Sequence, residues 1–250
     1  MDNNKKILQQ PWGGLGDNLS YSTLPEQFHK MGIDFYIHKD NAVRNQEIFD
    51  LVWGMNPYVK GVSDETPNCG PCNGWGHAGL NHINRMEAIN GASQSEEQLP
   101  KIYYKPNIIE EFIGKVVVNL ASISSIYSKE QIDLILNNIN SESDVVYISF
   151  EKNLNEKKPS ESIIGKNGNE HVNYVSDENA TIVDSIFEHC DIIHSCKKYV
   201  CLFSGACVLA SAIKGVSALP EVEVYIKGDM RNFLENENGY NFKNLTYKFV

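Results

Sequence analysis

The sequence predicts an α/β protein whose two halves each contain a parallel β-sheet. The first observation is that runs of β-branched and aromatic residues alternate with segments whose apolar residues recur at helical spacing. The second is that this alternation restarts at residues 115–121, KVVVNLA, a near-continuous apolar run typical of a strand buried on both faces. The third is the length of 250 residues, which is enough for two domains that each bury a core.

The first domain is predicted to span residues 1–113. It opens with a strand–helix–strand unit, the building block of a parallel sheet. Its expected elements are a strand at 5–10, a helix at 25–31, a strand at 33–39, a helix around 48–52, a strand at 58–62 and strand character at 101–107. Residues 63–100 are rich in Gly, Asn, Pro and Ser, and they interrupt the pattern as a large inserted loop with one helix within 79–90.

The second domain is predicted to span residues 114–250. Its expected elements are a strand at 115–121, a helix at 128–139, strands at 144–150 and 172–175, a helix at 180–190, a strand at 199–204, a helix at 205–215 and a final strand at 221–227. Ser128 is the expected N-cap of the first of these helices, whose apolar face carries Ile132, Ile135, Leu136 and Ile139. Residues 151–171 form a polar segment between two expected strands, and an Asn-rich segment follows the last expected strand.

The charge and hydropathy of the sequence argue against nucleic-acid binding and against a membrane-spanning segment. The net charge of −10 and the pI near 5.2 argue against a nucleic-acid-binding surface, which needs clustered Lys and Arg. No apolar stretch resembles a signal peptide or reaches the roughly 18 residues of a membrane span. We therefore expect a cytoplasmic protein that reaches the inner face of a membrane only through its substrate. The six cysteines are expected to be reduced, because they are too few for a disulfide scaffold in a chain of this length.

A glycine-rich corner follows the first expected strand. Gly13, Gly14 and Gly16 permit backbone conformations and close approaches that a Cβ would block. Asp17 comes next, near the start of a helix, where its charge is favoured and its pKa is expected to stay low. Such corners lie at the carboxyl edge of a parallel sheet, where ligands bind, and the edges of two domains can face each other across a cleft. Asp17 is therefore either a general base or a helix cap.

The stretch GGLGDNLSYSTLPEQFHKMGIDFYIH, residues 13–38, resembles the opening of the ADP-heptose-type lipopolysaccharide heptosyltransferases. These are inverting enzymes of the GT-B fold, in which two Rossmann-like domains face a cleft. The matching elements are Gly16, Asp17, Leu19, Thr23, Leu24 and Pro25. The resemblance implies that Asp17 is the catalytic base, that the first domain binds the acceptor and that the second domain binds a nucleotide sugar.

The second half resembles the same family at two places. Residues 115–136 are similar to the start of the family's donor domain, where a small-polar loop approaches the phosphates or the sugar. Residues 201–215, CLFSGACVLASAIKG, are similar to the stretch that opens a helix beside the donor diphosphate, although Phe203 and Val208 replace an acid and a histidine. Lys152 lies just beyond the strand expected at 144–150, and its positive charge makes it a candidate partner for a donor phosphate. The donor-side candidates are Ser122, Ser124, Lys152, Ser204, Gly205 and Ala206.

The inserted loop contains NCGPCNGWGHAGLNHINR, which has three interpretations. Cys69 and Cys72 have the spacing of a thioredoxin-like dithiol, but their flanks predict neither the strand nor the helix of that motif. Together with His77 and His82 they could bind zinc, but the spacing is shorter than in the usual finger. The third interpretation is acceptor binding, for which His77 and Arg85 are the candidates. We expect no cofactor and no metal.

These patterns predict an inverting, metal-independent glycosyltransferase with Asp17 as general base. It would move a sugar, with heptose as one candidate, from a nucleotide-sugar donor to a surface glycan that is lipid-linked in many such enzymes. The alternative is a non-catalytic nucleotide- or glycan-binding partner that keeps the GT-B fold, because Phe203 and Val208 alter the donor motif. The sequence does not identify the sugar, the nucleotide base or the acceptor.

Overall fold

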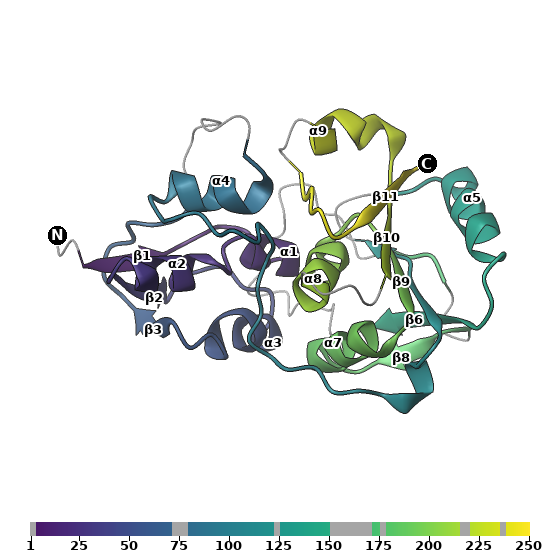
Figure 1. Ribbon diagram of the computed structural model, residues 1–250, viewed down its shortest axis with the longest axis horizontal. Helices are drawn as coiled ribbons and strands as arrows, with labels where there is room; N and C mark the ends of the chain where they lie inside the picture. The colour runs from purple at the N-terminus through teal and green to yellow at the C-terminus, as the bar shows by residue number, and fades with distance from the viewer. Residues whose placement is uncertain are drawn as a thin grey trace. The chain divides into compact units, whose positions relative to one another are not determined.

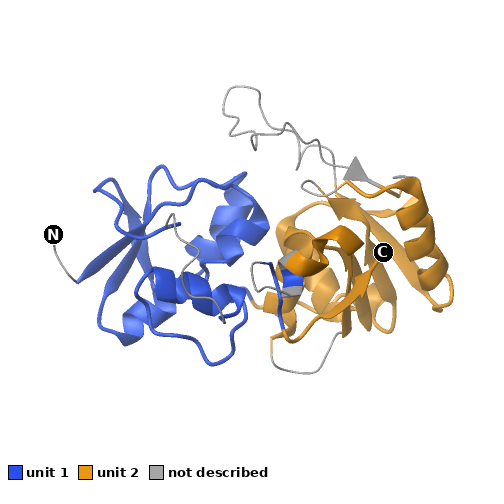
Figure 2. Ribbon diagram, turned by 90° about the horizontal axis from the view of Figure 1, so that it is seen from above, with its two compact units in different colours: residues 1–104, 234–242 blue, residues 105–233, 243–250 orange. Residues whose placement is uncertain are grey.

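The chain divides into two compact units (Figure 2). Unit 1 comprises residues 1–104 and 234–242, and unit 2 comprises residues 105–233 and 243–250. The chain therefore passes from one unit to the other three times. The computed structural model describes residues 4–71, 80–122, 126–150, 172–175, 179–215, 221–235 and 239–250.

Unit 1 is built on a three-stranded parallel sheet in the order β1–β2–β3 (Figure 1). Helix α2 packs on β2, and α4 packs on α2. The core includes Leu24, Phe28 and Phe35, and the two aromatic rings stack with centroids 5.8 Å apart. The elements are β1 Lys5–Leu8, α1 Leu15–Leu19, α2 Leu24–Lys30, β2 Asp34–His38, α3 Gln46–Phe49, the π-helical turn η1 Asp50–Gly54, β3 Val59–Ser63 and α4 His82–Ile89. The three predicted strands between residues 5 and 62 and the helix within the inserted loop are confirmed.

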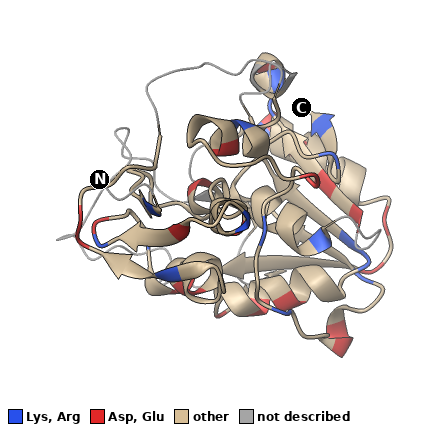
Figure 3. Cartoon of the chain, turned by 60° about the vertical axis from the view of Figure 1, so that its left-hand side comes forward, with Lys and Arg blue, Asp and Glu red and all other residues tan. Residues whose placement is uncertain are grey.

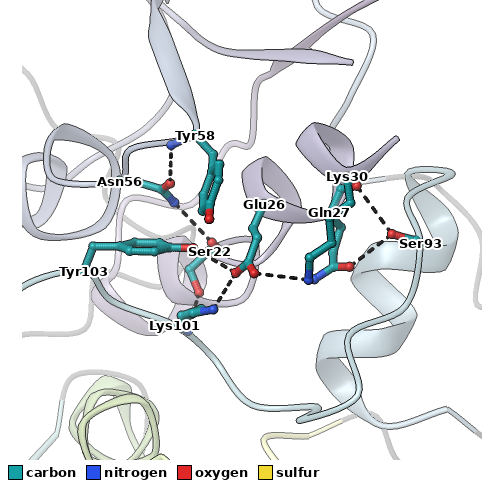
Figure 4. Close-up of polar contacts among 9 residues, drawn as sticks. All are labelled: Ser22, Glu26, Gln27, Lys30, Asn56, Tyr58, Ser93, Lys101 and Tyr103. Atoms are coloured by element: carbon teal, nitrogen blue, oxygen red, sulfur yellow. Dashed lines mark hydrogen bonds and ion pairs between the residues drawn. The ribbon is translucent and has the colours of Figure 1, made fainter. Parts of the chain in front are cut away.

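The predicted strand character at 101–107 is wrong. Residues 101–109 form neither a helix nor a sheet strand, and Lys101 and Tyr103 bind α2 instead (Figure 4). Glu26 of α2 accepts from Lys101 Nζ at 2.5 Å and Tyr103 Oη at 2.9 Å, and Lys30 Nζ lies 3.1 Å away. Burial acts to raise the pKa of Glu26, but the bonds from Lys101, Tyr103 and Lys30 outweigh it and lower that pKa to about 2. We call Glu26, Lys30, Lys101 and Tyr103 the Glu26 cluster.

Unit 2 is built on a six-stranded parallel sheet in the order β11–β10–β9–β4–β6–β8. In chain order the strands run outward from β4 in one direction and from β9 in the other, which is the doubly wound arrangement of Rossmann folds. Its strands are β4 Val116–Asn119, β6 Val145–Phe150, β8 Thr181–Val183, β9 Lys198–Leu202, β10 Glu221–Ile226 and β11 Thr246–Phe249. The short strands β5 Ala121–Ser122 and β7 Val172–Asn173 pair antiparallel beside it.

The helices of unit 2 connect these strands. They are η2 Glu110–Phe112, α5 Lys129–Ile139, α7 Ile186–Ser195, α8 Gly205–Lys214, η4 Gly228–Met230 and α9 Arg231–Glu235. Ser128 caps α5 in a capping box with Gln131, which confirms the predicted N-cap. The helix predicted at 180–190 is partly wrong, because its first residues form β8 and the helix begins only at Ile186. Strand β11, within the predicted tail, was not expected.

In Figure 3 the ribbon positions of Lys and Arg and those of Asp and Glu are interspersed along the described part of the chain. In unit 2 the buried carboxylate of Glu223 binds Lys198 Nζ at 3.1 Å and Lys248 Nζ at 2.9 Å. Bonds from these lysines lower the pKa of Glu223 although its burial acts to raise it. Among the helices of the described ranges, none combines the length and apolar character needed to cross a membrane.

Candidate functional site

The turn after β1 brings Asp17 against the main chain of Gly14. Asp17 is on α1, and the N–H of Gly14 hydrogen-bonds its carboxylate. A Cβ on Gly14 would lie 2.6 Å from Asp17 Oδ2, so no larger residue fits there without displacing the carboxylate. Gly13 O accepts from Arg44 N at 2.8 Å, and a Cβ on Gly13 would lie 3.1 Å from that nitrogen. Gly16 is buried within α1.

Asp17 and Arg44 carry opposite charges, and each charge favours the ionised form of the other. The position of a Cβ on Gly14 lies 3.8 Å from Arg44 Nη2, so both side chains approach the same point of the turn. Burial raises the pKa of Asp17, and the Gly14 N–H and the Arg44 charge only partly oppose this effect. The expectation of a low pKa is therefore wrong, because the carboxylate is partly removed from water. A raised pKa suits a general base better than an unperturbed carboxylate.

A buried network of amide side chains supports this turn. Gln10 Nε2 donates to Ala42 O at 2.8 Å and to Asn18 Oδ1 at 3.3 Å. Asn18 Nδ2 donates to Gly14 O at 2.9 Å, and Trp53 Nε1 donates to Asn18 Oδ1 at 2.9 Å. Gln10, Asn18 and Trp53 are almost fully buried, so breaking any of these bonds would leave a costly unpaired group. We call residues 10–18 and 41–44 the Asp17 corner.

In unit 2 the strand order reverses between β4 and β9, which pair side by side in the middle of the sheet. Ligands of doubly wound sheets bind outside the carboxyl ends of the strands at such a reversal. Ser204 follows β9 and caps α8, with its Oγ accepting from Ala206 N at 3.3 Å, and Gly205 is the first residue of that helix. Ser122, in β5 beyond the end of β4, is 3% exposed. The structure thus places Ser122, Ser204, Gly205 and Ala206 just beyond the ends of the two strands that meet at this reversal.

A buried polar chain supports the end of β4. Asn119 Oδ1 accepts from Ala121 N at 3.1 Å, and Asn119 Nδ2 donates to Tyr199 Oη at 3.1 Å. Tyr199 Oη lies 2.7 Å from His189 Nε2. The Tyr199 hydroxyl thus links the Asn119 amide to the His189 ring. Burial lowers the pKa of His189 to about 3, so the ring stays neutral at physiological pH.

His77, Ser124, Lys152 and Cys72 fall outside the described residues, so their roles stay predictions. Arg85 is 5% exposed and donates to Leu80 O at 3.1 Å.

The remaining residues of the proposed zinc or dithiol stretch make other contacts. Cys69 Sγ donates to Asn90 Oδ1 at 3.0 Å and is not in a disulfide. His82 Nε2 lies 2.8 Å from Ser20 Oγ, and burial lowers the pKa of His82 to about 4. Within the described ranges, no group of three or more His, Cys, Asp or Glu side chains is placed to hold a metal ion.

Two residues of the Asp17 corner were missed by the sequence analysis. Arg44 follows β2 and Trp12 follows β1, and these parallel strands pair in register from Lys5 with Asp34 to Leu8 with Ile37. The carboxyl ends of paired parallel strands meet at one edge, so the prediction of strands at 5–10 and 33–39 already implied that the residues after them are neighbours. The side chain of Trp12 is 51% exposed.

Comparison with known proteins gives structural likeness only. No protein-family model matches the chain, and no curated protein matches it significantly by sequence. The glycosyltransferase TibC of enterotoxigenic E. coli, described as iron-containing and dodecameric, is 14% identical with a TM-score of 0.56, over 88% of this chain and 57% of TibC. Another TibC structure is in complex with ADP-D-β-D-heptose. The chain thus spans less than two thirds of TibC.

Two further E. coli proteins match along most of both chains. The ADP-heptose lipopolysaccharide heptosyltransferase II is 10% identical with a TM-score of 0.56, over 98% of this chain and 90% of that enzyme. The heptosyltransferase WaaC, solved with ADP, is 10% identical with a TM-score of 0.53, over 98% of this chain and 91% of WaaC. These likenesses confirm the predicted fold: an α/β chain with two parallel sheets, structurally similar to heptosyltransferases of the GT-B type.

Proposed function

We propose that the protein is an inverting, metal-independent glycosyltransferase that moves a sugar from a nucleotide-sugar donor to a surface-glycan acceptor, with heptose as one candidate sugar. The observation that carries this proposal is Asp17, a partly buried carboxylate held by the Gly14 main chain and balanced by Arg44 at the carboxyl edge of a parallel sheet. Asp17 would take the proton of the acceptor hydroxyl as its oxygen attacks the anomeric carbon and the bond to the diphosphate breaks.

We assign the acceptor to unit 1 and the donor to unit 2. The strand reversal between β4 and β9 and the capped start of α8 support a diphosphate site near Ser122, Ser204, Gly205 and Ala206. TibC and WaaC, which have similar folds, were solved with ADP-heptose and ADP. Ser124 and Lys152 complete the proposed donor site. His77 and Arg85 are proposed on the acceptor side. We propose that the reaction takes place in the cytoplasm, and that a lipid-linked acceptor would bring the protein to the inner face of the membrane.

The second candidate is a non-catalytic nucleotide- or glycan-binding partner with the same fold. Phe203 and Val208 favour it, because both are buried apolar residues at positions where the resembling family has an acid and a histidine. A donor site without these polar groups would bind a nucleotide through the main chain of α8 and leave the leaving group less well stabilised.

Asp17→Asn tests the catalytic proposal. The amide keeps the size of the side chain but cannot accept a proton, so we expect transfer from ADP-heptose to fall by at least about a hundredfold. Nucleotide binding and the melting temperature should stay close to those of the parent. Near-parental transfer combined with a lower melting temperature would instead make Asp17 a helix cap.

Gly205→Val tests the donor site, and the parent itself separates the two candidates. Added bulk at the start of α8 should abolish thermal stabilisation by ADP, whereas Ala212→Val, later in the same helix, should leave it unchanged. Stabilisation of a folded Gly205→Val variant equal to that of the parent would remove this site from the proposal. ADP stabilisation of the parent without any transfer to surface glycans would favour the non-catalytic candidate.

A further inference from the structure

Trp12 presents an exposed aromatic ring on the same chain segment as the proposed base. Its side chain is 51% exposed, and among the described residues its ring makes no aromatic or cation–π contact. Trp12 lies two positions before Gly14, whose main chain contacts the Asp17 carboxylate, and two residues of extended chain span at most about 7 Å. The exposed ring therefore belongs to the same edge of unit 1 as Asp17.

A single exposed apolar residue is ordinary on protein surfaces, so exposure alone carries no argument. Trp12 differs from an ordinary exposed apolar residue because a buried side chain holds its backbone in place. Trp12 N donates to Gln10 Oε1 at 2.7 Å, and Gln10 is fully buried and bonded in turn to Ala42 O and Asn18. The next residue, Gly13, is bonded to Arg44 N. A rigid support under an exposed aromatic ring is the arrangement of a preorganised binding site.

Arg44 adds hydrogen-bond donors to the same corner, because its Nη2 lies 3.8 Å from the position of a Cβ on Gly14. Its side chain is partly buried, and within the described part of the chain its guanidinium donates no hydrogen bond, while its charge interacts with Asp17. Burial acts to lower the pKa of Arg44 and Asp17 acts to raise it, but an arginine remains protonated in either case. The corner thus combines an aromatic face, the N–H donors of a guanidinium and a carboxylate.

Sugar rings match this combination. One face of a pyranose presents C–H groups, which pack favourably on the negative face of an indole, and its rim presents hydroxyl oxygens that accept hydrogen bonds. We propose that Trp12 and Arg44 form a subsite that holds a pyranose ring of the glycan acceptor, with one ring face on Trp12 and hydroxyl oxygens accepting from Arg44. This inference rests on the proposed function, because it makes the bound sugar the group that Asp17 deprotonates.

The test measures binding without donor, so that it does not depend on transfer. The full-length parent is applied to an array of bacterial surface oligosaccharides without nucleotide sugar, and the strongest binder is titrated into the parent and each variant by isothermal titration calorimetry. We expect Trp12→Ala to weaken this binding at least tenfold, about 1.4 kcal/mol, and Trp12→Phe to stay within about threefold of the parent. Arg44→Ala should weaken binding as well. The bound oligosaccharide should also protect the parent from quenching by acrylamide.

Met55→Ala is the matched control, because Met55 is an apolar residue of unit 1 with a similar exposure of 43%. It should bind the oligosaccharide as the parent does, and thermal melts should show all variants folded. Equal binding by the parent and a folded Trp12→Ala, or binding of no array glycan by the parent, would overturn the proposal. Failure of the proposed function would give a different result, namely undiminished transfer by Asp17→Asn.

Discussion

The Glu26 cluster allows a quantitative prediction of pH-dependent stability. The pKa of Glu26 falls from 4.5 to about 2 on folding, a difference that corresponds to at most about 3 kcal/mol of stability at neutral pH. Lys101 and Lys30 are 38% and 56% exposed, so solvent screening should reduce this contribution to about 1–2 kcal/mol. Because the folded pKa is the lower one, the contribution is complete above pH 4.5 and is lost as the pH falls through about 2.

Glu26→Gln removes this charge and isolates the effect. We expect the variant to unfold with about 1–2 kcal/mol less free energy than the parent at neutral pH, and the difference to shrink by more than half near pH 3. Urea unfolding followed by tryptophan fluorescence measures it selectively, because Trp12, Trp53 and Trp75 all lie in the segment 1–104 of unit 1. Glu97→Gln, which changes an exposed glutamate of the same unit, is the control. A difference that stays constant from pH 7 to pH 3 would refute the electrostatic reasoning.

Three other substitutions have defined outcomes. Gly14→Ala would place a methyl group 2.6 Å from Asp17 Oδ2 and displace the carboxylate. Transfer from ADP-heptose should therefore fall at least about tenfold, with little change in melting temperature. Unchanged turnover would show that the position of the carboxylate is unimportant. Tyr199→Phe would leave two buried polar groups unpaired, so the unfolding free energy should fall by about 2–4 kcal/mol. Urea unfolding followed by circular dichroism measures this loss, and a loss below about 0.5 kcal/mol would contradict the reasoning. In Gly70→Ala, at a φ of 156°, the new methyl group would clash with a main-chain oxygen, so this variant should lose clearly more unfolding free energy than Gly91→Ala. At Gly91, with a φ of 74°, a methyl group meets no atom within 4 Å, and equal losses of unfolding free energy in fluorescence-detected unfolding would count against the clash.

Local patterns predicted those elements whose signals lie within a few residues of each other. Helix α5 carries its cap, its capping box and its apolar face within one short segment, and it was predicted almost to its ends. Strand β8 was missed because Thr181–Val183 is only three residues long and continues directly into a helical pattern. Ser185 and Glu188 marked the true boundary, since Ser185 Oγ accepts from Glu188 N at 3.0 Å in the spacing of a capping box.

Non-local contacts account for the remaining differences. Residues 101–107 have strand-forming side chains, but Lys101 and Tyr103 bind Glu26 on a helix instead of pairing in a sheet. Asp17 was found because it stands within a local motif. Its charged neighbour Arg44 lies 27 residues further along the chain and is brought there only by the pairing of β1 with β2. The pKa of Asp17 depends on that neighbour and on burial, and neither is visible in the glycine motif.

The return of residues 234–242 to unit 1 has a consequence for biosynthesis. Within unit 1 the ring of Tyr240 meets His82 edge-on with centroids 5.0 Å apart, and Phe242 is 1% exposed, before the chain goes back to unit 2 as β11. Neither unit is therefore encoded by one continuous stretch of the gene. A stop codon after residue 233 would remove an anchor of one unit and the edge strand of the other. Unit 1 reaches its full set of contacts only when translation has passed residue 242, and unit 2 only when it has passed residue 249. Nascent chains must keep two incomplete cores from aggregating until then.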